Sequence, residues 1–103
     1  MKVLIAEDDR MLSDMLSARL RTSGFQVLTA YDAMQALMVA VRSVPSVIIL
    51  DISMPAGTGL DVLAKLKRSN KTALIPVIVL TANADPEMGN TARGLGEIGR
   101  AHV

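Results

Sequence analysis

Three short apolar runs, rich in β-branched residues, dominate the pattern of hydrophobic and polar positions along this chain. They occupy residues 3–6, 47–50 and 77–80 and read VLIA, VIIL and VIVL. Continuous runs of this length are typical of strands that are buried on both faces, as in a parallel sheet flanked by helices. The pattern therefore predicts three strands at the centre of a parallel α/β sheet.

The segments between these runs have the spacing of amphipathic helices. Residues 10–22, 32–41 and 60–68 repeat apolar side chains every three or four positions, which predicts three helices. Ser23 and Gly24 mark the end of the first helix, and Asp32 is a suitable N-cap for the second. The apolar stripes are Leu12, Met15, Leu16 and Leu20; Met34, Leu37, Met38 and Val41; and Leu60, Leu63 and Leu66.

The alternation of strands and helices indicates the topology. Residues 25–30 predict a further strand. Asp85-Pro86-Glu87 predicts the start of a fourth helix, because it combines an N-cap, a proline at the first helical position and an acid in the first turn. The order βαβαβαβα predicts right-handed crossovers and one doubly wound sheet. We expect the strand order 2-1-3-4, numbered along the chain.

Composition narrows the classes of function. The 103 residues suit a single domain, and 11 basic against 10 acidic residues give a net charge of +1 without any basic block. This balance gives no electrostatic support for nucleic-acid binding. The chain has no cysteine and one histidine, which argues against disulfides, thiol chemistry and a zinc site. No apolar run approaches membrane-spanning length, so we expect a cytoplasmic domain.

Residues that can handle a metal ion or a phosphoryl group follow all three apolar runs. Glu7-Asp8-Asp9 follows the first run, Asp51 the second and Thr81 the third. Ligands of parallel α/β sheets bind outside the carboxyl ends of the strands, so these residues should meet at one edge. Clustered carboxylates repel one another, and Mg2+ with its preference for oxygen ligands relieves that repulsion. An aspartate beside such an ion can act as a nucleophile toward phosphorus.

Each of these residues also has a simpler structural interpretation. An acidic run favours a helix N-terminus, an aspartate suits the turn after a strand, and threonine is common in strands. Those interpretations would have to hold independently for three groups of residues that are expected at the same edge of the sheet. We therefore favour a functional site.

With these motifs in this order, the chain resembles the receiver domain of bacterial two-component response regulators. The matching segments are VLIAEDD at residues 3–9, IILDISMPAGTG at residues 48–59 and VIVLTA at residues 77–82. The resemblance covers residues 1–96. It implies a flavodoxin-like fold and phosphorelay signal transduction by a domain that is not a metabolic enzyme.

The resemblance also implies roles for individual residues. Asp51 corresponds to the residue that accepts the phosphoryl group. Glu7 and Asp8 correspond to the acidic pair of the Mg2+ site, which Asp51 and the backbone carbonyl of Ser53 complete. Asp9 is more simply explained as a helix cap or as an acid that supports the metal ligands without binding the ion.

Further matches concern the switch and the loops. Thr81 corresponds to the hydroxyl that moves toward the phosphoryl group, and Ala82 to a small residue that leaves the group accessible. Pro55 and Gly59 correspond to loop residues with a structural role.

The implied partner is a histidine kinase or a histidine phosphotransfer protein that docks beside the first helix. Met11 lies off the apolar stripe of that helix and is a candidate for the docking surface. We expect no nucleic-acid or membrane contact from this segment. The sequence leaves the oligomeric state, the cognate kinase, the output domain and the lifetime of the phosphoryl group open.

The C-terminal residues depart from the family. Receivers carry a lysine at the end of a fifth strand, but residues 97–103 read EIGRAHV and contain neither a lysine nor a strand pattern. One codon set for this tail, GAG ATC GGA AGA GCA CAC GTC, looks like the start of a short-read sequencing adapter. We therefore expect an incomplete receiver domain over residues 1–96, a non-native tail over residues 97–103, and no fifth βα unit. The fourth strand should then be an uncovered edge, which favours aggregation.

Two other classes of protein use related arrangements. A pseudo-receiver that is not phosphorylated would act only as an interaction module, but such domains usually lose an acid or the acceptor. An aspartate-nucleophile phosphatase would resemble a DxD motif, whereas the position two residues after Asp51 is Ser53. Both alternatives are less consistent with this sequence than a receiver.

Overall fold

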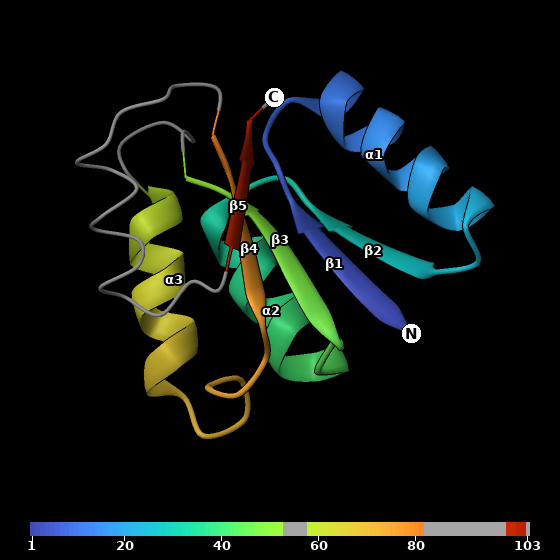
Figure 1. The fold of residues 1–103 in the computed structure, drawn as a ribbon. Helices are drawn as coiled ribbons and strands as arrows, with labels where there is room; N and C mark the ends of the chain where they lie inside the picture. The colour runs from blue at the N-terminus through green and yellow to red at the C-terminus, as the bar shows by residue number, and fades with distance from the viewer. Residues whose placement is uncertain (53–57, 82–98, 103) are drawn as a thin grey trace.

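The computed structural model describes residues 1–52, 58–81 and 99–102, and these residues form a parallel sheet with helices on both faces (Figure 1). Within the described residues the strand order is β2-β1-β3-β4-β5. The predicted order 2-1-3-4 is therefore confirmed. The strands are β1 (Lys2–Ala6), β2 (Gln26–Ala30), β3 (Val47–Asp51), β4 (Val77–Thr81) and β5 (Gly99–His102).

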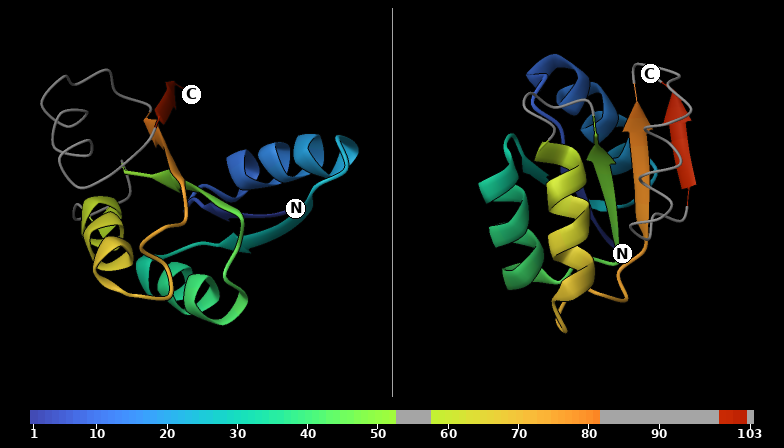
Figure 2. Two further views of the ribbon diagram at one scale, coloured as in Figure 1. Left: turned by 60° about the horizontal axis from the view of Figure 1, so that its bottom comes forward. Right: turned by 90° about the vertical axis from the view of Figure 1, so that its left-hand side faces the viewer.

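The described helices are arranged in two layers around the sheet. They are α1 (Arg10–Thr22), α2 (Ala33–Ser43) and α3 (Thr58–Arg68). Helix α1 covers one face of the sheet, and α2 and α3 cover the other (Figure 2). Within the described residues, no helix combines the length and the apolar character needed to cross a membrane.

The apolar runs supply the core on both faces. On the α2 and α3 side, buried side chains of β1, β3 and β4 pack against the helices. The cluster includes Leu4, Ile48, Leu50, Val77 and Val79 of the strands and Val62, Leu63 and Leu66 of α3. On the α1 side, Val3, Ile5 and Val27 pack against partly buried Leu16, Leu20 and Phe25. Burial on both faces explains why the runs at residues 3–6, 47–50 and 77–80 are apolar at every position.

The predicted caps of α1 and α2 and the predicted end of α1 are confirmed, whereas α2 continues to Ser43 instead of ending at Val41 and α3 begins at Thr58 instead of Leu60. The Asp9 side chain accepts hydrogen bonds from the backbone N–H groups of Met11 and Leu12 at 3.0 and 3.2 Å, and thereby caps α1. Asp32 caps α2 in the same way, because its Oδ1 accepts from the N–H of Gln35 at 2.8 Å. Helix α1 ends before Gly24, whose φ of +95° is a conformation that glycine adopts without a steric cost.

The predicted apolar stripe of α2 is wrong except for Leu37, which packs against the core, and that of α1 is partly wrong. The residues of α2 that are buried against the sheet are Ala36 and Ala40, whereas Met34, Met38 and Val41 are exposed. On α1 the fully buried positions are Ser13 and Ser17, and Met15 is exposed. Small side chains let a helix approach the sheet closely, and a hydrophobic pattern gives small residues little weight.

The prediction that the chain lacks a fifth strand is also wrong. Residues Ile78–Thr81 of β4 pair in parallel with Gly99–His102, so β4 is not an uncovered edge there. The pairing uses backbone N–H and C=O groups, which every non-proline residue carries, and an edge strand needs no apolar run. The helix predicted to start at Asp85 lies outside the described residues.

Val44 holds a strained conformation at the end of α2. Its φ and ψ are 42° and 68°, which is the left-handed region, and it is followed by a proline. A β-branched residue rarely adopts this conformation, which costs about 1–2 kcal/mol. The backbone N–H of Val44 donates to Ala40 O at 3.0 Å, so the strain accompanies a hydrogen bond that closes the helix.

We expect Val44→Gly to raise the free energy of unfolding by about 1 kcal/mol, because glycine relieves the strain but loses more chain entropy. Urea denaturation of both proteins measures the change. The control is Val41→Gly within α2, which should instead destabilise the protein by about 1 kcal/mol because glycine is a poor helix former. A loss of stability for Val44→Gly would contradict the expectation.

Candidate functional site

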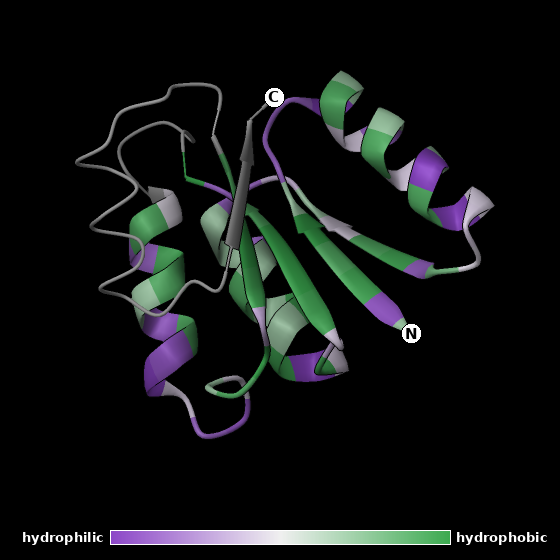
Figure 3. Cartoon of the chain, in the orientation of Figure 1, coloured by the Kyte–Doolittle hydropathy of each residue, from purple (hydrophilic) through white to green (hydrophobic). Residues whose placement is uncertain are grey.

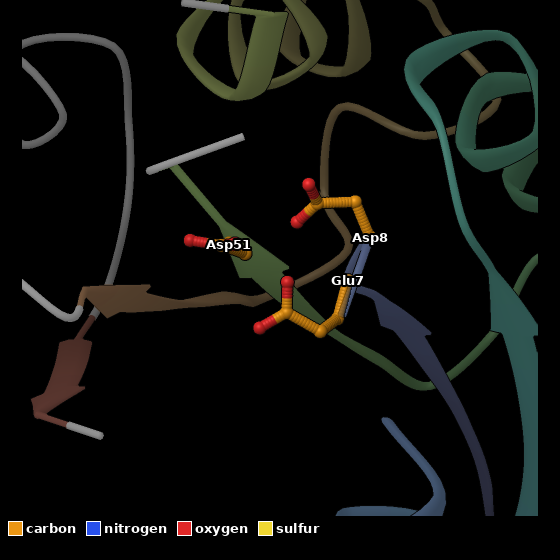
Figure 4. Close-up of side chains that lie close together, drawn as sticks. All are labelled: Glu7, Asp8 and Asp51. Carbon is orange, nitrogen blue, oxygen red and sulfur yellow. The ribbon is translucent and has the colours of Figure 1, made fainter. Parts of the chain in front are cut away.

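The acidic residues predicted from the sequence meet at the carboxyl edge of the sheet. Strands β1 and β3 are parallel neighbours with Ala6 opposite Leu50, so Glu7 and Asp51 occupy adjacent positions in register. The backbone N–H of Glu7 donates to Ala30 O at 3.0 Å, which continues the pairing of β1 with β2 one residue further. Figure 4 shows the side chains of Glu7, Asp8 and Asp51 gathered beside the end of β3.

Three carboxylates form one compact group of oxygen atoms. One carboxylate oxygen from each of Glu7, Asp8 and Asp51 lies within 4.8 Å of the others. Glu7 and Asp51 are only 3% and 7% exposed, whereas Asp8 is exposed. A cluster with two buried acids and one exposed acid gives a divalent cation several oxygen ligands and an open side for water. The residues present therefore fit Mg2+.

The buried acid Glu7 has a strongly perturbed pKa. Burial is the largest cause, followed by hydrogen bonding to Asp51 and Asp8 and by the charge of Asp51, and together they raise the pKa of Glu7 from 4.5 to about 8. The backbone N–H of Asp9, 3.4 Å from Glu7 Oε2, acts in the opposite direction. A cation-free cluster at neutral pH thus holds a proton on Glu7, which reduces the repulsion among the three acids.

In the absence of divalent cations, we expect the free energy of unfolding to decrease as the pH rises from about 4.5 to about 8. The folded state keeps its proton on Glu7 across this range while the unfolded state releases it, so the stabilisation present at low pH is lost. The slope from this group is at most about 1.4 kcal/mol per pH unit. Urea denaturation in chelator-containing buffers measures it. Glu7→Gln should flatten the profile, and an unchanged slope in that variant would contradict the assignment to Glu7.

The structure describes only some of the other predicted site residues. Thr81 is the last residue of β4, one position beyond Leu80, which pairs with Asp51. Its backbone therefore reaches the same edge of the sheet as the acidic cluster. Ser53 and Ala82, predicted as a metal ligand and as the access residue, lie outside the described residues, as does Pro55.

Two features of this edge were not predicted. Gly59, expected to be a loop residue, is the second residue of α3 and packs against the backbone of Asp51 and Ile52. The guanidinium carbon of Arg10 lies 4.2 Å from the centre of the Tyr31 ring, a cation–π contact between the start of α1 and the residue that follows β2. No spacing pattern links Arg10 to Tyr31, so only the fold reveals this pair.

Comparisons with known proteins agree with this architecture. The family described as response regulator receiver domain matches residues 3–99. The chain is 40% identical over 95 residues to "Probable transcriptional regulatory protein TcrX" of Mycobacterium tuberculosis. This alignment covers 89% of this chain and 40% of TcrX. The chain spans between 33% and 41% of the length of TcrX, RpaA, CpxR and PhoB, four curated relatives that it matches.

Solved structures are similar over almost the whole chain. The Vibrio cholerae chemotaxis protein CheY4 superposes with a TM-score of 0.92 at 30% identity, covering 98% of this chain and 84% of that one. The receiver domain of the sensor histidine kinase PA1611 from Pseudomonas aeruginosa superposes with a TM-score of 0.88 at 25% identity. The superposition covers 98% of this chain and 83% of the PA1611 chain. The structure of PA1611 holds a magnesium ion coordinated in its active-site cleft.

Proposed function

This chain belongs to the response regulator receiver family, and from that premise we propose that it takes a phosphoryl group onto Asp51 in a Mg2+-dependent reaction. Its function is phosphorelay signalling, as in the response regulators to which it is similar. The observation that carries the residue-level proposal is the cluster of Glu7, Asp8 and Asp51 at the carboxyl edge of the sheet.

Asp51 is the best candidate for the acceptor because of its position. It ends the central strand β3, it is almost buried, and its carboxylate lies beside two further acids. In the proposed reaction a carboxylate oxygen of Asp51 bonds to phosphorus while the bond from phosphorus to the donor's imidazole nitrogen breaks. The rigid strand fixes the attacking oxygen, which lowers the entropic cost of reaching the reactive geometry.

Glu7, Asp8, Asp51 and the backbone carbonyl of Ser53 would hold Mg2+, which when bound neutralises charge on the transferring group. Asp8 is exposed and is suited to direct ligation from the open side of the cluster. Glu7 is buried behind it and is suited to act through a water molecule. Both acids surround the acceptor, so their charges must be compensated before an anionic phosphoryl group can approach.

The proposed roles of Thr81 as the switch residue and of Ala82 as the access residue rest on the positions of these residues in the chain. Thr81 at the end of β4 would donate its hydroxyl to a phosphoryl oxygen, and Ala82 after it would leave room for the group to enter. Formation of that hydrogen bond favours one of two pre-existing states of the domain, so phosphorylation shifts a population rather than creating a new fold.

The proposed phosphodonor is a histidine kinase or a histidine phosphotransfer protein. Met11 on α1 is 76% exposed, which is compatible with a docking surface beside that helix. We propose a cytoplasmic location, because TcrX and CpxR are named as transcriptional regulatory proteins and such proteins act where bacterial DNA is found. The domain is proposed to signal without metabolic catalysis, and without nucleic-acid or membrane contacts of its own.

We also propose that the native receiver sequence occupies residues 1–96 and that residues 97–103 derive from a sequencing adapter. Pairing of β5 with β4 is no argument against this origin, because backbone hydrogen bonds do not depend on the side chains. The described β5 contains no lysine, so the family's lysine would come from the native continuation. Sequencing the uninterrupted gene beyond Gly96 tests this proposal, and a stop codon after Val103 would overturn it.

Titration of the full-length protein with acetyl phosphate and with beryllofluoride tests the proposed function, because a chain without the family's lysine could fail to respond for that reason alone. With Mg2+ present, we expect acetyl phosphate to add one phosphoryl group that is stable in acid and released by hydroxylamine. Under the same conditions, beryllofluoride should shift the NMR signals of residues near Asp51. With chelator present, neither should occur. A pseudo-receiver would give no response, and a phosphatase would hydrolyse a free phosphomonoester repeatedly; either outcome would overturn the receiver assignment of Asp51.

A further inference from the structure

The connection between β1 and α1, residues 7–9, carries two of the three clustered acids and no apolar side chain. Glu7 and Asp8 both lie in it, and in Figure 3 it is coloured hydrophilic after the apolar run of β1. Asp8 is exposed, so burial does not hold its side chain in place. The position of Asp8 therefore depends on individual contacts that fix the backbone on either side of it.

Two contacts tie this connection to consecutive residues, the last of β2 and the one after it. Before Asp8, the backbone N–H of Glu7 donates to Ala30 O at 3.0 Å. After Asp8, the guanidinium carbon of Arg10 lies 4.2 Å from the centre of the Tyr31 ring. Asp8 thus lies between a backbone hydrogen bond and a cation–π contact, and both are made to the same short segment.

The Tyr31 ring stands on a fixed backbone. The backbone N–H of Tyr31 donates to Gln35 Oε1 at 2.9 Å, and the N–H of Gln35 in turn donates to Oδ1 of Asp32, the N-cap of α2. On the strand side, Thr29 Oγ1 lies 3.5 Å from the Tyr31 hydroxyl oxygen. Tyr31 is partly buried, whereas Arg10 is exposed. The ring is therefore the fixed partner of the pair, and the guanidinium is the group that it holds.

Arg10 is also the basic residue nearest in sequence to the acidic cluster. It follows three acids directly, and a guanidinium pairs readily with carboxylates. In the structure the guanidinium lies over the Tyr31 ring instead. A guanidinium released from the ring would compete with a divalent cation for the carboxylate oxygens. The contact with Tyr31 therefore keeps the cluster open to a cation.

We propose that Tyr31, through its contact with Arg10, is a positioning residue for the divalent-cation site of Glu7, Asp8 and Asp51. It restrains the connection that carries Asp8 and keeps the guanidinium off the carboxylates. A site that is ordered before its ligand arrives loses less entropy on binding, so the contact raises the affinity for Mg2+. This inference rests on the proposed function, because it takes the acidic cluster as the Mg2+ site.

Tyr31→Leu tests the contribution of the ring without a change in charge. A cation–π contact at an exposed site can change an equilibrium about two- to fivefold, so the dissociation constant for Mg2+ should rise by about that factor. Two-dimensional NMR of the protein titrated with MgCl2 measures the constant from signals near the cluster. Tyr31→Phe keeps the ring and should keep the affinity of the unsubstituted protein. Equal affinities of the Leu and Phe variants would overturn the proposal.

A double-mutant cycle assigns the effect to the pair of residues. Arg10→Gln and the double variant Arg10→Gln/Tyr31→Leu carry the same charge, and the ring has no guanidinium to hold in either protein. They should therefore bind Mg2+ equally. A purely structural effect of Tyr31→Leu would persist without Arg10, so weaker binding by the double variant would overturn the proposal.

Arg19→Gln is the matched control, because Arg19 is an exposed arginine in the last turn of the same helix. In the Arg19→Gln background, Tyr31→Leu should still weaken Mg2+ binding about two- to fivefold. Loss of the effect in this background too would show that total charge, and not contact with the ring, governs the affinity. That result would also overturn the proposal.

The same titrations separate this inference from the proposed function. If the unsubstituted protein binds Mg2+ and Tyr31→Leu binds it equally well, the positioning role is wrong and the Mg2+ site stands. If the unsubstituted protein shows no Mg2+-dependent shifts near Asp51, both are wrong. Because leucine is apolar and Tyr31 is only partly buried, Tyr31→Leu should fold, and a cooperative urea transition without Mg2+ checks this.

Discussion

Asp51→Asn should abolish stable phosphorylation of this chain by acetyl phosphate in the presence of Mg2+. An amide oxygen is a poor nucleophile, and the substitution also removes one of the three charges that would hold the cation. Mass spectrometry of the intact protein measures the loss as the absence of the phosphorylated species. Because asparagine has nearly the size of aspartate, the core around this position should stay packed.

The matched control is Asp9→Asn, the same change two residues away from Glu7. Asp9 lies outside the carboxylate cluster and caps α1, a role that asparagine also performs. Asp9→Asn should therefore retain phosphorylation. Retention of phosphorylation in Asp51→Asn, or loss in both variants, would contradict the assignment of the acceptor.

A second measurement separates chemistry from folding. The charge of Asp51 and its hydrogen bonding to Glu7 both raise the pKa of Glu7, so Asp51→Asn should reduce the pH dependence of cation-free stability. We expect the variant to unfold cooperatively with a flatter pH profile. A chain that has simply failed to fold would show no cooperative transition.

The sequence predicted the site because the site depends on strand ends. Three apolar runs identified β1, β3 and β4, and the acids after the first two had to meet once the strands were parallel neighbours. The strand pattern also placed Thr81 at this edge, and its role as the switch hydroxyl stays a prediction that the family resemblance implies. The depth of Glu7 and its raised pKa could not be predicted, because they depend on how the surrounding layers exclude water.

Helix orientation and the fifth strand show where sequence patterns are weak. Ala36 and Ala40 face the sheet because their small size allows close packing, while the larger Met34 and Met38 remain outside. A pattern weighted by hydrophobicity selects the methionines. Strand β5 forms through backbone pairing with β4, which leaves no signature in the side chains.

Gly59→Ala should both destabilise the protein and slow phosphoryl transfer. A Cβ atom at this position would lie 2.5 Å from Ile52 Cα and closer still to the carbonyl oxygen of Asp51. Both contacts are with backbone, so no flexible side chain can move aside. Alanine normally stabilises a helix relative to glycine by about 1 kcal/mol, but relief of this overlap costs about 1–3 kcal/mol and outweighs that gain.

The overlap should affect both the free energy of unfolding and the rate of phosphoryl transfer, because the backbone that must move is that of the proposed acceptor. A displacement of about 1 Å in a reacting group can slow a reaction roughly 100-fold. Gly24→Ala is the matched control: its φ of +95° strains an alanine by about 1–2 kcal/mol, yet nothing lies within 4 Å of the added Cβ. Urea denaturation should show both variants destabilised, and the rate of acetyl phosphate labelling should fall only for Gly59→Ala. Equal labelling rates in the two variants would show that contact between α3 and the end of β3 does not position Asp51.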